Sequence, residues 1–172
     1  MAAIDNTTDG AARRFHCVRT ALTLLLLIGG LVSPAPGQAS PPPPSPRLPL
    51  ELLPDTLAIC RLSPDAALPA WASLTGRFVT ISRTAEELSV TAVQDAIPAS
   101  VRCERDYRAL RVKGTLPPNL VGILLSIARP LAERGLAISA ISTFDTDYVL
   151  VKARDLSAAL DALRAAGHTI HP

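Results

Sequence analysis

The chain has 172 residues, of which 48% are hydrophobic but only 3% aromatic, and its formal net charge is +2. This length is enough for one ordinary domain or two small ones, with an aliphatic core. The excess charge lies in residues 1–47, which hold four Arg and two Asp, so the rest of the chain is neutral. A neutral chain with few aromatic rings lacks the basic stripe or stacking platform that nucleic acids require, and we expect no nucleic-acid partner.

Residues 1–39 resemble a secretory leader. Three Arg between positions 13 and 19 precede an apolar stretch at 21–32, and small residues follow at 37–39, where a signal peptidase would cut. The apolar stretch is shorter than the roughly 20 residues of a membrane helix, so we expect no stable membrane span. Residues 40–47 are rich in Pro and predict a stiff linker. The alternative is that translation begins after Met1, the only Met, and that this segment is not made.

The first folded unit is predicted at 48–107. We expect a strand at 56–62, a short helix at 68–74 around Trp71, and strands at 78–82, 88–93 and 101–106. The segment 94–98 is too short for a full helix. Cys60 and Cys103 lie in this unit, and they either form a disulfide or remain buried thiols.

The second unit, 108–172, has a clearer pattern. A half-buried strand is predicted at 108–113, and Asn119 is placed to cap a helix that Pro130 should kink and Gly135 should end. One face of this helix is apolar, with Leu120, Ile123, Leu124, Ile127 and Leu131. Strands are then expected at 137–142 and 147–152.

A second helix completes this unit. Asp155 is expected to cap it, Leu156, Ala159, Leu160 and Leu163 share one face, and Gly167 should end it before a short strand at 169–170. The order β-α-β-β-α-β is complete in this unit and abbreviated in the first. We therefore predict an α+β protein of two tandem ferredoxin-like domains, each an antiparallel sheet with its helices on one face.

An internal repeat supports this duplication. ISRTAEELSVTA (Ile81–Ala92) and ISTFDTDYVLVK (Ile141–Lys152) are sixty residues apart, and each reads as an apolar run, a polar turn with an acid, and an alternating apolar run. That pattern predicts a β-hairpin in each unit.

No reactive centre is evident in the sequence. The three His are His16, His168 and His171, and the last two should face opposite sides of one strand; no metal-ligand spacing or glycine-rich phosphate loop occurs. Asp145 and Asp147 have no His or nucleophile near them in the sequence. The Arg residues at 102, 105, 108 and 111 alternate with acids and predict a solvated strand edge rather than an anion site. We predict a protein that is not an enzyme, with no catalytic residue, metal or cofactor.

The sequence NLVGILLSIARPLAERGLAISAIST, which continues as FDTDYVLVK, resembles the signature of ACT domains. Residues 48–171 as a whole resemble short bacterial proteins of two tandem ACT domains, which are related to the CASTOR-type arginine sensors and to the regulatory half of aspartate kinases. The resemblance implies a cytoplasmic regulatory protein that binds an amino acid, forms a homodimer or contacts a regulated partner protein, and has no catalytic domain.

The resemblance also implies where a ligand would bind. An ACT ligand lies where the first strand leads into the first helix, with backbone N–H groups holding its carboxylate, and beside the strand pair, where an Asp can bind its ammonium group. Carried to this chain, the ligand-binding residues are Asn119, Leu120, Val121, Gly122, Ile123, Ser142, Thr143, Phe144, Asp145, Thr146 and Asp147. The alternative is that the two Asp only shape the turn.

Two further alternatives stay open at this point. The first hairpin departs from the pattern, with Arg83 in place of Thr143 and no glycine before a helix, so the first domain either has a pocket of its own or serves mainly as a pairing partner. The protein is either an amino-acid sensor or a structural or protein-interaction module with an ACT-like fold and no metabolite, since a fold does not fix a function. Export through the segment 13–39 is the alternative to a cytoplasmic location.

Overall fold

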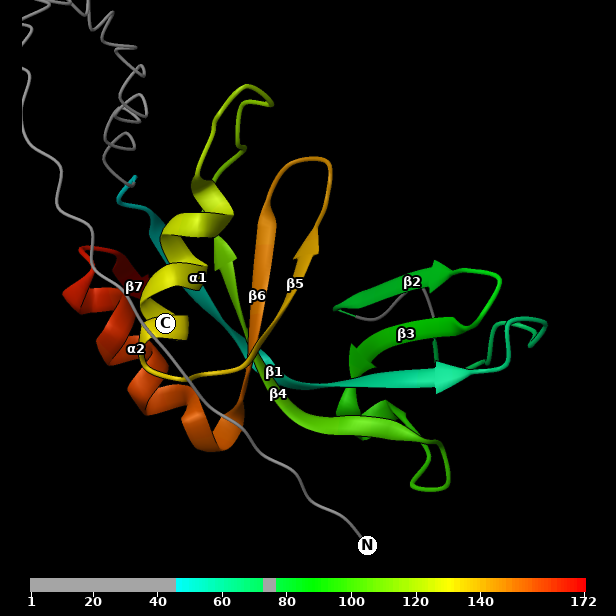
Figure 1. Cartoon of the computed structure of the whole chain (residues 1–172). Helices are drawn as coiled ribbons and strands as arrows, with labels where there is room; N and C mark the ends of the chain where they lie inside the picture. Colours follow the sequence, from blue (N-terminus) through cyan, green and yellow to red (C-terminus); the bar gives the residue numbers. More distant parts are fainter. Residues whose placement is uncertain (1–45, 73–76) are drawn as a thin grey trace, which may run out of the picture. The chain divides into compact units, whose positions relative to one another are not determined.

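The computed structural model describes residues 46–72 and 77–172 (Figure 1). The predicted leader and most of the predicted linker lie outside these residues. No helix in the described part of the chain is long and apolar enough to cross a membrane. The elements are β1 (Pro49–Leu62), β2 (Val79–Arg83), β3 (Leu88–Val93), the 3-10 helix η1 (Gln94–Ala96), β4 (Cys103–Val112), α1 (Ile123–Glu133), β5 (Ile138–Ser142), β6 (Asp147–Lys152), the 3-10 helix η2 (Ala153–Asp155), α2 (Leu156–Ala165) and β7 (Thr169–His171).

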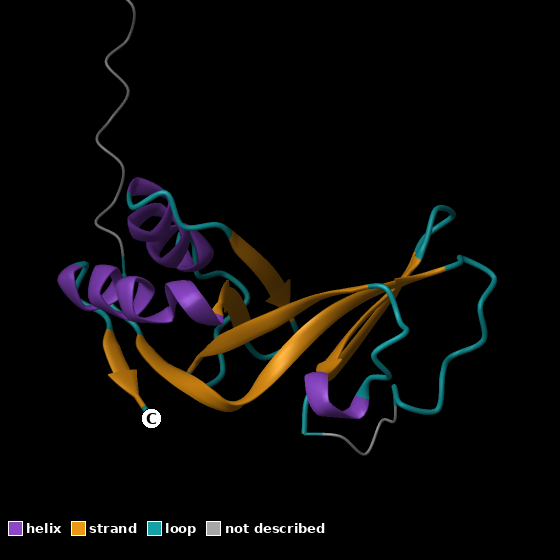
Figure 2. Ribbon diagram, turned by 90° about the horizontal axis from the view of Figure 1, so that it is seen from below, coloured by secondary structure: helices purple, strands orange, loops and turns teal. Residues whose placement is uncertain are grey.

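The seven strands form one sheet. Their order is β2-β3-β1-β4-β6-β5, and β7 pairs with β1 beside this path. All pairs are antiparallel except β1 with β7. The long strands β1 and β4 curve along their length (Figure 2). They connect the part of the sheet that carries α1 and α2 to a second part of the sheet, beside which the described residues form only the short η1. The sequence predicts two separate sheets, and the structure joins them through β1 and β4.

Strand β1 begins seven residues before the predicted strand at 56–62. Its first residues pair with β4 and β7, and its last six pair with β3. The sequence concealed this start because Pro54 lies inside the strand. The structure places Pro54 at a shift in the β1–β4 register between Leu52 and Thr56, and an irregularity of this kind accommodates a proline that cannot donate to the ladder.

Strand β4 combines the two strands predicted at 101–106 and 108–113. The predicted boundary between residues 107 and 108 therefore lies inside one strand, and a division into two domains there stays a prediction. The expectation that the Arg series marks a strand edge is wrong for Arg108 and Arg111, because β4 lies between β1 and β6 there. The part of β4 at 103–106 pairs with no strand other than β1, so the half-buried Arg105 does lie at an edge. Arg111 pairs with Glu51 across the sheet at 2.5 Å, and Arg108 donates to the Leu53 carbonyl at 3.0 Å.

Helices α1 and α2 pack on the same face of the sheet, as predicted. Their buried residues form one cluster with β1, β4 and β6: Leu48, Leu50, Leu110, Val112, Ile123, Ile127, Leu131, Val149, Val151, Ala159, Ala162 and Leu163. From β4 to β7 the order β-α-β-β-α-β is confirmed. The predicted four-stranded antiparallel sheet is wrong in one respect, because β1 lies between β4 and β7 and pairs parallel with β7.

The helices end as predicted but begin differently. At the end of α1, Gly135 donates to the Ala132 carbonyl and Leu136 donates to the Leu131 carbonyl, which is the Schellman pattern. Gly167 and His168 make the equivalent bonds at the end of α2. The predicted caps are wrong, because no side chain caps either helix: Gly122 occupies the N-cap of α1, and Asp155 makes no capping bond to α2.

A buried histidine offsets the effect of Pro130 inside α1. Proline has no N–H, so the Ser126 carbonyl, four residues earlier, loses its helical donor. The Nε2 atom of His168 lies 3.1 Å from this carbonyl, and the Leu48 N–H donates to the Nδ1 atom of His168 at 3.2 Å. His168 is 5% exposed and precedes β7, so it ties α1 to the start of β1 instead of sharing a strand with His171.

The other part of the sheet carries no α-helix among the described residues. The helix predicted at 68–74 is wrong for residues 68–72, which form loop and turn, and its last two residues lie outside the described ranges. Small side chains dominate the buried cluster here: Ala58, Cys60, Ala72, Leu88, Val90, Ala92 and Ile97. Cys60 and Cys103 face each other on β1 and β4 and form a disulfide.

Candidate functional site

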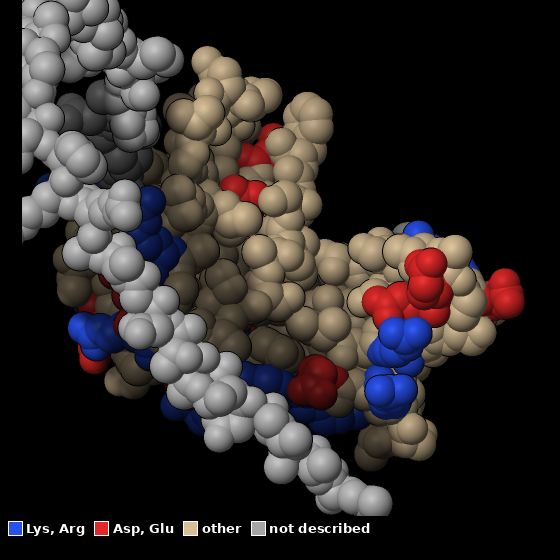
Figure 3. Space-filling model, in the orientation of Figure 1, with Lys and Arg blue, Asp and Glu red and all other residues tan. Residues whose placement is uncertain are grey.

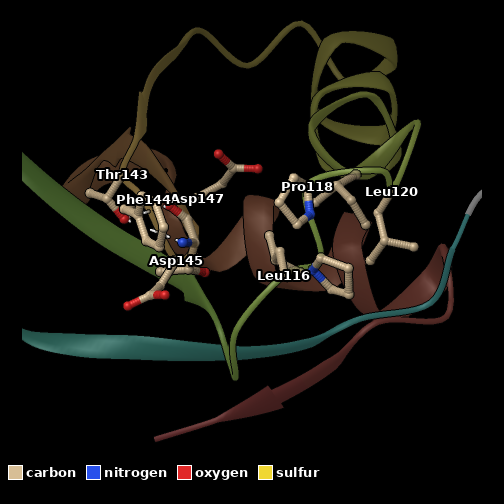
Figure 4. Close-up of a pocket in the computed structure, with 10 residues that line it drawn as sticks. Leu116, Pro118, Leu120, Thr143, Phe144, Asp145 and Asp147 are labelled. Carbon is tan, nitrogen blue, oxygen red and sulfur yellow. Dashed lines mark hydrogen bonds between the residues drawn. The ribbon is translucent and has the colours of Figure 1, made fainter.

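The β5–β6 turn and the loop before α1 enclose a cavity of about 180 Å³, which we call the hairpin cavity (Figure 4). Residues 143–147 form one wall, and most of the other consists of Leu116, Pro117, Pro118 and Leu120. Buried Ile123 closes it at the start of α1. Its lining residues are Leu116, Pro117, Pro118, Leu120, Ile123, Thr143, Phe144, Asp145, Thr146 and Asp147.

Two threonines hold the β5–β6 turn. The Thr143 N–H and hydroxyl both donate to the Thr146 carbonyl, at 2.9 and 2.8 Å. The buried Thr146 hydroxyl donates to the Val112 carbonyl at 2.7 Å, and the Leu116 N–H donates to the Asp145 carbonyl at 2.8 Å. These bonds fix the turn against the end of β4 and the loop that follows. The turn therefore does not depend on the Asp145 carboxylate.

The two carboxylates of the turn have different surroundings. The Ser142 hydroxyl donates to Asp147 at 2.5 Å, and no ion pair to either Asp145 or Asp147 is present among the described residues. In Figure 4 the Asp147 side chain extends into the space between the turn and the loop, whereas Asp145 is directed away from the loop. No Lys or Arg lines the cavity. Acidic atoms lie there without basic neighbours in the space-filling view (Figure 3).

The opposite wall ends at the exposed start of α1. Gly122 has a φ of +80°, in the left-handed region that favours glycine, and its carbonyl accepts the first helical bond from the Ser126 N–H at 2.9 Å. The N–H groups of residues 123–125, which come between Gly122 and Ser126, have no acceptor within the helix. These donors and the helix dipole favour a negative group at the start of α1, where Ile123 lines the cavity.

The structure brings some of the predicted ligand residues together and leaves others out. Leu120, Ile123 and residues 143–147 line the hairpin cavity. Asn119, Val121, Gly122 and Ser142 do not line it, although Gly122 sets the start of α1 and Ser142 holds Asp147. Sequence reasoning missed residues 116–118. The adjacent Pro117 and Pro118 ahead of α1 indicate a stiff loop, and this signal could have suggested that the loop forms one wall of a cavity.

Several large apolar side chains face solvent, and two of them, Leu120 and Phe144, line the cavity. Phe144 is 98% exposed and Val121 is 77% exposed, and Leu120 and Leu125 are about half exposed. Scattered apolar side chains are normal on a surface, whereas a large contiguous apolar patch is typical of a binding surface.

The first hairpin does not reproduce this site. The Thr84 N–H bonds to the Glu87 carbonyl at 2.9 Å, so Thr84, and not Arg83, corresponds to Thr143. The predicted alignment of Ile81 with Ile141, sixty residues apart, is therefore wrong. In the structure the two hairpins correspond at a spacing of 59 residues. A shift of one residue places the Ile81 and Ile141 side chains on opposite faces of their hairpins. Glu87 in this turn pairs with Arg61 at 2.6 Å, so its charge is neutralised.

The polar side chains that line the hairpin cavity are those of Thr143, Asp145, Thr146 and Asp147. Its lining contains no His, Cys or Lys. Across the described residues, no group of three or more His, Cys, Asp and Glu is placed to hold a metal ion.

The family model of the ACT domain matches residues 102–165, which include β4, both helices and the hairpin cavity, so the protein contains an ACT domain. A second family model, described as an N-terminal domain, matches residues 55–100. Protein Atu0741 from Agobacterium tumefaciens is 39% identical, with a TM-score of 0.70 over 74% of this chain and 94% of that one. The chain belongs to the same family as Atu0741.

More distant structures share the fold. VC0802 from Vibrio cholerae, described as a protein of unknown function and possible transport protein, is 22% identical, with a TM-score of 0.56 over 69% of this chain and 89% of that one. The regulatory subunit of aspartate kinase from Thermus flavus is 14% identical, with a TM-score of 0.50 over 70% of this chain and 99% of that one. No curated protein matches the chain.

Proposed function

We propose that this protein is a non-catalytic regulatory protein that binds a free amino acid in the hairpin cavity. The observation that carries the proposal is the pairing of opposite polarities across one small space. The start of α1 offers unpaired N–H groups, and the facing turn offers the Asp147 carboxylate. A free amino acid carries a carboxylate and an ammonium group, so it complements both walls.

The charge of the cavity narrows the class of ligand. Two acidic residues and no basic residue line it. An additional positive charge on the ligand would be favoured, and an additional negative charge would be repelled, because opposite charges attract strongly where water is partly excluded. We therefore expect neutral or basic amino acids to bind more tightly than Asp or Glu.

The size of the cavity agrees with a small ligand. A cavity of about 150 Å³ holds a molecule the size of benzene, and the hairpin cavity measures about 180 Å³. A small amino acid fits this space, and a longer side chain extends beyond its open mouth.

The exposed apolar side chains beside the cavity support a partner at this face. Phe144, Val121 and Leu125 expose large apolar areas to water, and a second copy of the chain or a regulated protein would cover them. We expect the ligand to change the strength of that contact, because a ligand bound at an interface is coupled to it in free energy. A homodimer that forms through this face is the simplest form of the proposal.

The disulfide supports export over a cytoplasmic location. Disulfides persist in oxidising compartments and are rare in the cytosol, and Cys60 and Cys103 form one here. Together with the signal-like segment 13–39 it favours a protein that binds its ligand outside the cytoplasm. Mass spectrometry of the native protein should show cleavage near residue 39 and no free thiol at either position. An intact Met1 with two free thiols would contradict export.

A thermal-shift screen of the purified protein against the twenty amino acids tests the proposed function. A ligand at a hundred times its dissociation constant stabilises the folded state by about 2.7 kcal/mol, which gives a clear rise in melting temperature. We expect a neutral or basic amino acid to give the largest rise. If none of them raises the melting temperature at millimolar concentration, the proposal of an amino-acid sensor is contradicted. The alternative, an interaction module that binds no metabolite, would then be favoured.

A further inference from the structure

Another cavity lies at the end of β6 that is remote from the hairpin cavity, and we call it the basic cavity. Strand β6 begins at Asp147, which lines the hairpin cavity, and ends at Lys152, which lines the basic cavity. The basic cavity measures about 310 Å³, at the lower end of the range of small-molecule sites. Its lining residues, none of which lines the hairpin cavity, are Arg105, Asp106, Lys152, Ala153 and Arg154.

The lining of the basic cavity is positively charged. Its three basic side chains come from three elements: Arg105 from β4, Lys152 from the end of β6 and Arg154 from η2. Asp106 is the one acidic residue of the lining, so three positive charges less one negative charge leave a net charge of +2. Figure 3 shows Lys and Arg gathered along the lower side of the molecule, with acidic atoms among them. This charge is opposite in sign to that of the hairpin cavity and favours an anion.

A β-bulge places Arg105 and Asp106 at the basic cavity. These two residues of β4 together lie opposite Ala58 of β1. Asp106 has a φ of +63°, and the described residues include no other non-glycine residue with a positive φ. The Gln94 side chain holds it there, because its amide accepts a bond from the Asp106 N–H at 2.7 Å and donates to the Asp106 carboxylate at 3.0 Å. Bulges and strained residues of this kind are common beside binding sites.

The two Arg side chains of the lining have N–H donors to spare. Arg105 donates to the Pro98 carbonyl at 3.0 Å, and no carboxylate lies within ion-pair distance of Arg105 in the described part of the chain. Arg154 lies 3.6 Å from the Asp155 carboxylate, too far for a hydrogen bond, and its side chain is 81% exposed. Each guanidinium has five N–H donors in one plane, a geometry that suits the oxygens of a phosphate or a carboxylate.

Lys152 is bound to the protein and contributes charge to the cavity. Its Nζ atom donates to the Arg105 carbonyl at 2.8 Å and to the Glu104 carboxylate at 3.2 Å, and it lies 4.0 Å from the centre of the Tyr107 ring. Glu104 does not line the cavity and is 77% exposed, so water weakens its interaction with Lys152. The bond to the Arg105 carbonyl joins the end of β6 to the bulge, so these two walls of the cavity are already in place.

We propose that the basic cavity binds a phosphate group, either as free phosphate or as part of a small metabolite. Arg105 and Arg154 donate to its oxygens from β4 and η2, and Lys152 adds positive charge. A phosphate group carries nearly two negative charges at neutral pH and has at least three acceptor oxygens, so it matches the net charge of +2 and both Arg side chains. A single carboxylate supplies only one charge and two oxygens. The proposal is independent of the amino-acid site.

The test is a titration of the full-length protein with inorganic phosphate and with glycerol phosphate, at constant ionic strength and at a pH where both are dianions. Amide chemical shifts should change saturably at residues 105, 106 and 152–155. Tighter binding of glycerol phosphate would identify a metabolite as the source of the phosphate, and equal binding would identify free phosphate. Succinate, whose two charges lie on separate carboxylates, should bind about tenfold more weakly. Equal binding of succinate would overturn the proposal, as would the absence of saturable shifts at millimolar concentration.

Two matched variants separate the cavity from the overall charge of the protein. Arg154→Gln removes an exposed side chain that makes no hydrogen bond among the described residues, and it should weaken phosphate binding about tenfold through the loss of a charge-assisted hydrogen bond. Arg164→Gln removes an exposed Arg of α2 that lies outside the cavity, and it should leave phosphate binding unchanged. An equal loss of binding in both variants would contradict a built site, because it would show that phosphate responds only to net charge.

Discussion

The part of the sheet under α1 and α2 and the part without an α-helix bury their apolar side chains in different ways. Under the helices, twelve buried residues, most of them Leu, Ile or Val, pack into one cluster. In the other part the buried cluster has seven residues, three of them Ala, and a disulfide joins β1 to β4. The comparison shows that a covalent link and a packed loop replace two helices where apolar volume is small.

The hairpins that extend from these two parts differ in the same way. The turn beside the helices leaves its carboxylates unpaired and closes a cavity against the start of α1. In the other turn, Glu87 pairs with Arg61, and Arg61 also binds the Glu86 carbonyl. The proposed binding site includes a helix start, and among the described residues only the β5–β6 hairpin lies beside one.

The largest expected effect comes from the helix-covered core. Leu163 and Leu88 are both fully buried, one in each cluster. Leu163→Ala should lower the free energy of unfolding by about 4 kcal/mol, because a cavity remains between two helices and a sheet. Leu88→Ala should cost about 3 kcal/mol, because its neighbours are a loop that can relax. Urea denaturation of both variants checks this, and an equal or larger cost for Leu88→Ala would remove the contrast between the two cores.

Removal of the disulfide should act mainly on the part without helices. The bridge closes a loop with a sequence separation of 43 residues, and Cys60→Ala with Cys103→Ala should lower the free energy of unfolding by about 3 kcal/mol. Hydrogen exchange should then rise in β2 and β3 more than in α1 and α2. A uniform rise over the whole sheet would show that the disulfide does not serve this part in particular.

His168 provides a smaller and more local test. His168→Ala leaves the Leu48 N–H and the Ser126 carbonyl without partners, so we expect a loss of about 2 kcal/mol. Pro130→Ala returns an N–H to the Ser126 carbonyl. The cost of His168→Ala should therefore be smaller in the Pro130→Ala background, and a double-mutant cycle measures the difference. Strict additivity of the two changes would contradict the compensation between them.

Substitutions in the hairpin cavity should give the smallest change, which is a change in the free energy of ligand binding. Asp147→Asn should weaken binding of the amino acid found in the screen about tenfold, because it removes a charged partner of the ammonium group. Asp145→Asn should have a smaller effect, since its side chain is directed away from the loop. Glu87→Gln in the other hairpin should have none. Calorimetric titration measures all three, and a larger effect of Glu87→Gln than of Asp147→Asn would move the site to the other hairpin.

The sequence predicted the elements whose signals are local. The periodic face of α1, the glycines that end both helices and the alternation in β3, β5 and β6 are each set within a few residues. The first half of β1 was hidden, because Pro49 and Pro54 argue against a strand. Only the structure shows that Pro49 is the first residue of β1 and that Pro54 lies at the register shift. The parallel pair of β1 and β7 depends on residues more than a hundred positions apart, which no local pattern encodes.

The lining of the hairpin cavity was also predicted only where its signals are local in the sequence. Sequence reasoning found both segments of the hairpin cavity, because a helix start and a polar turn have local signatures. It missed Leu116, Pro117 and Pro118, whose role depends on where the loop lies in space. It also aligned the two hairpins one residue out of register, because the repeated letters and the turn bonds have different spacing.

The difference between the hairpins is tested most directly by mapping amide chemical shifts while the selected amino acid is titrated into the full-length protein. The account predicts shifts at residues 123–125 and 143–147 and none at residues 84–87. Shifts at residues 84–87 of equal size, or saturable binding with no shift at the start of α1, would contradict it.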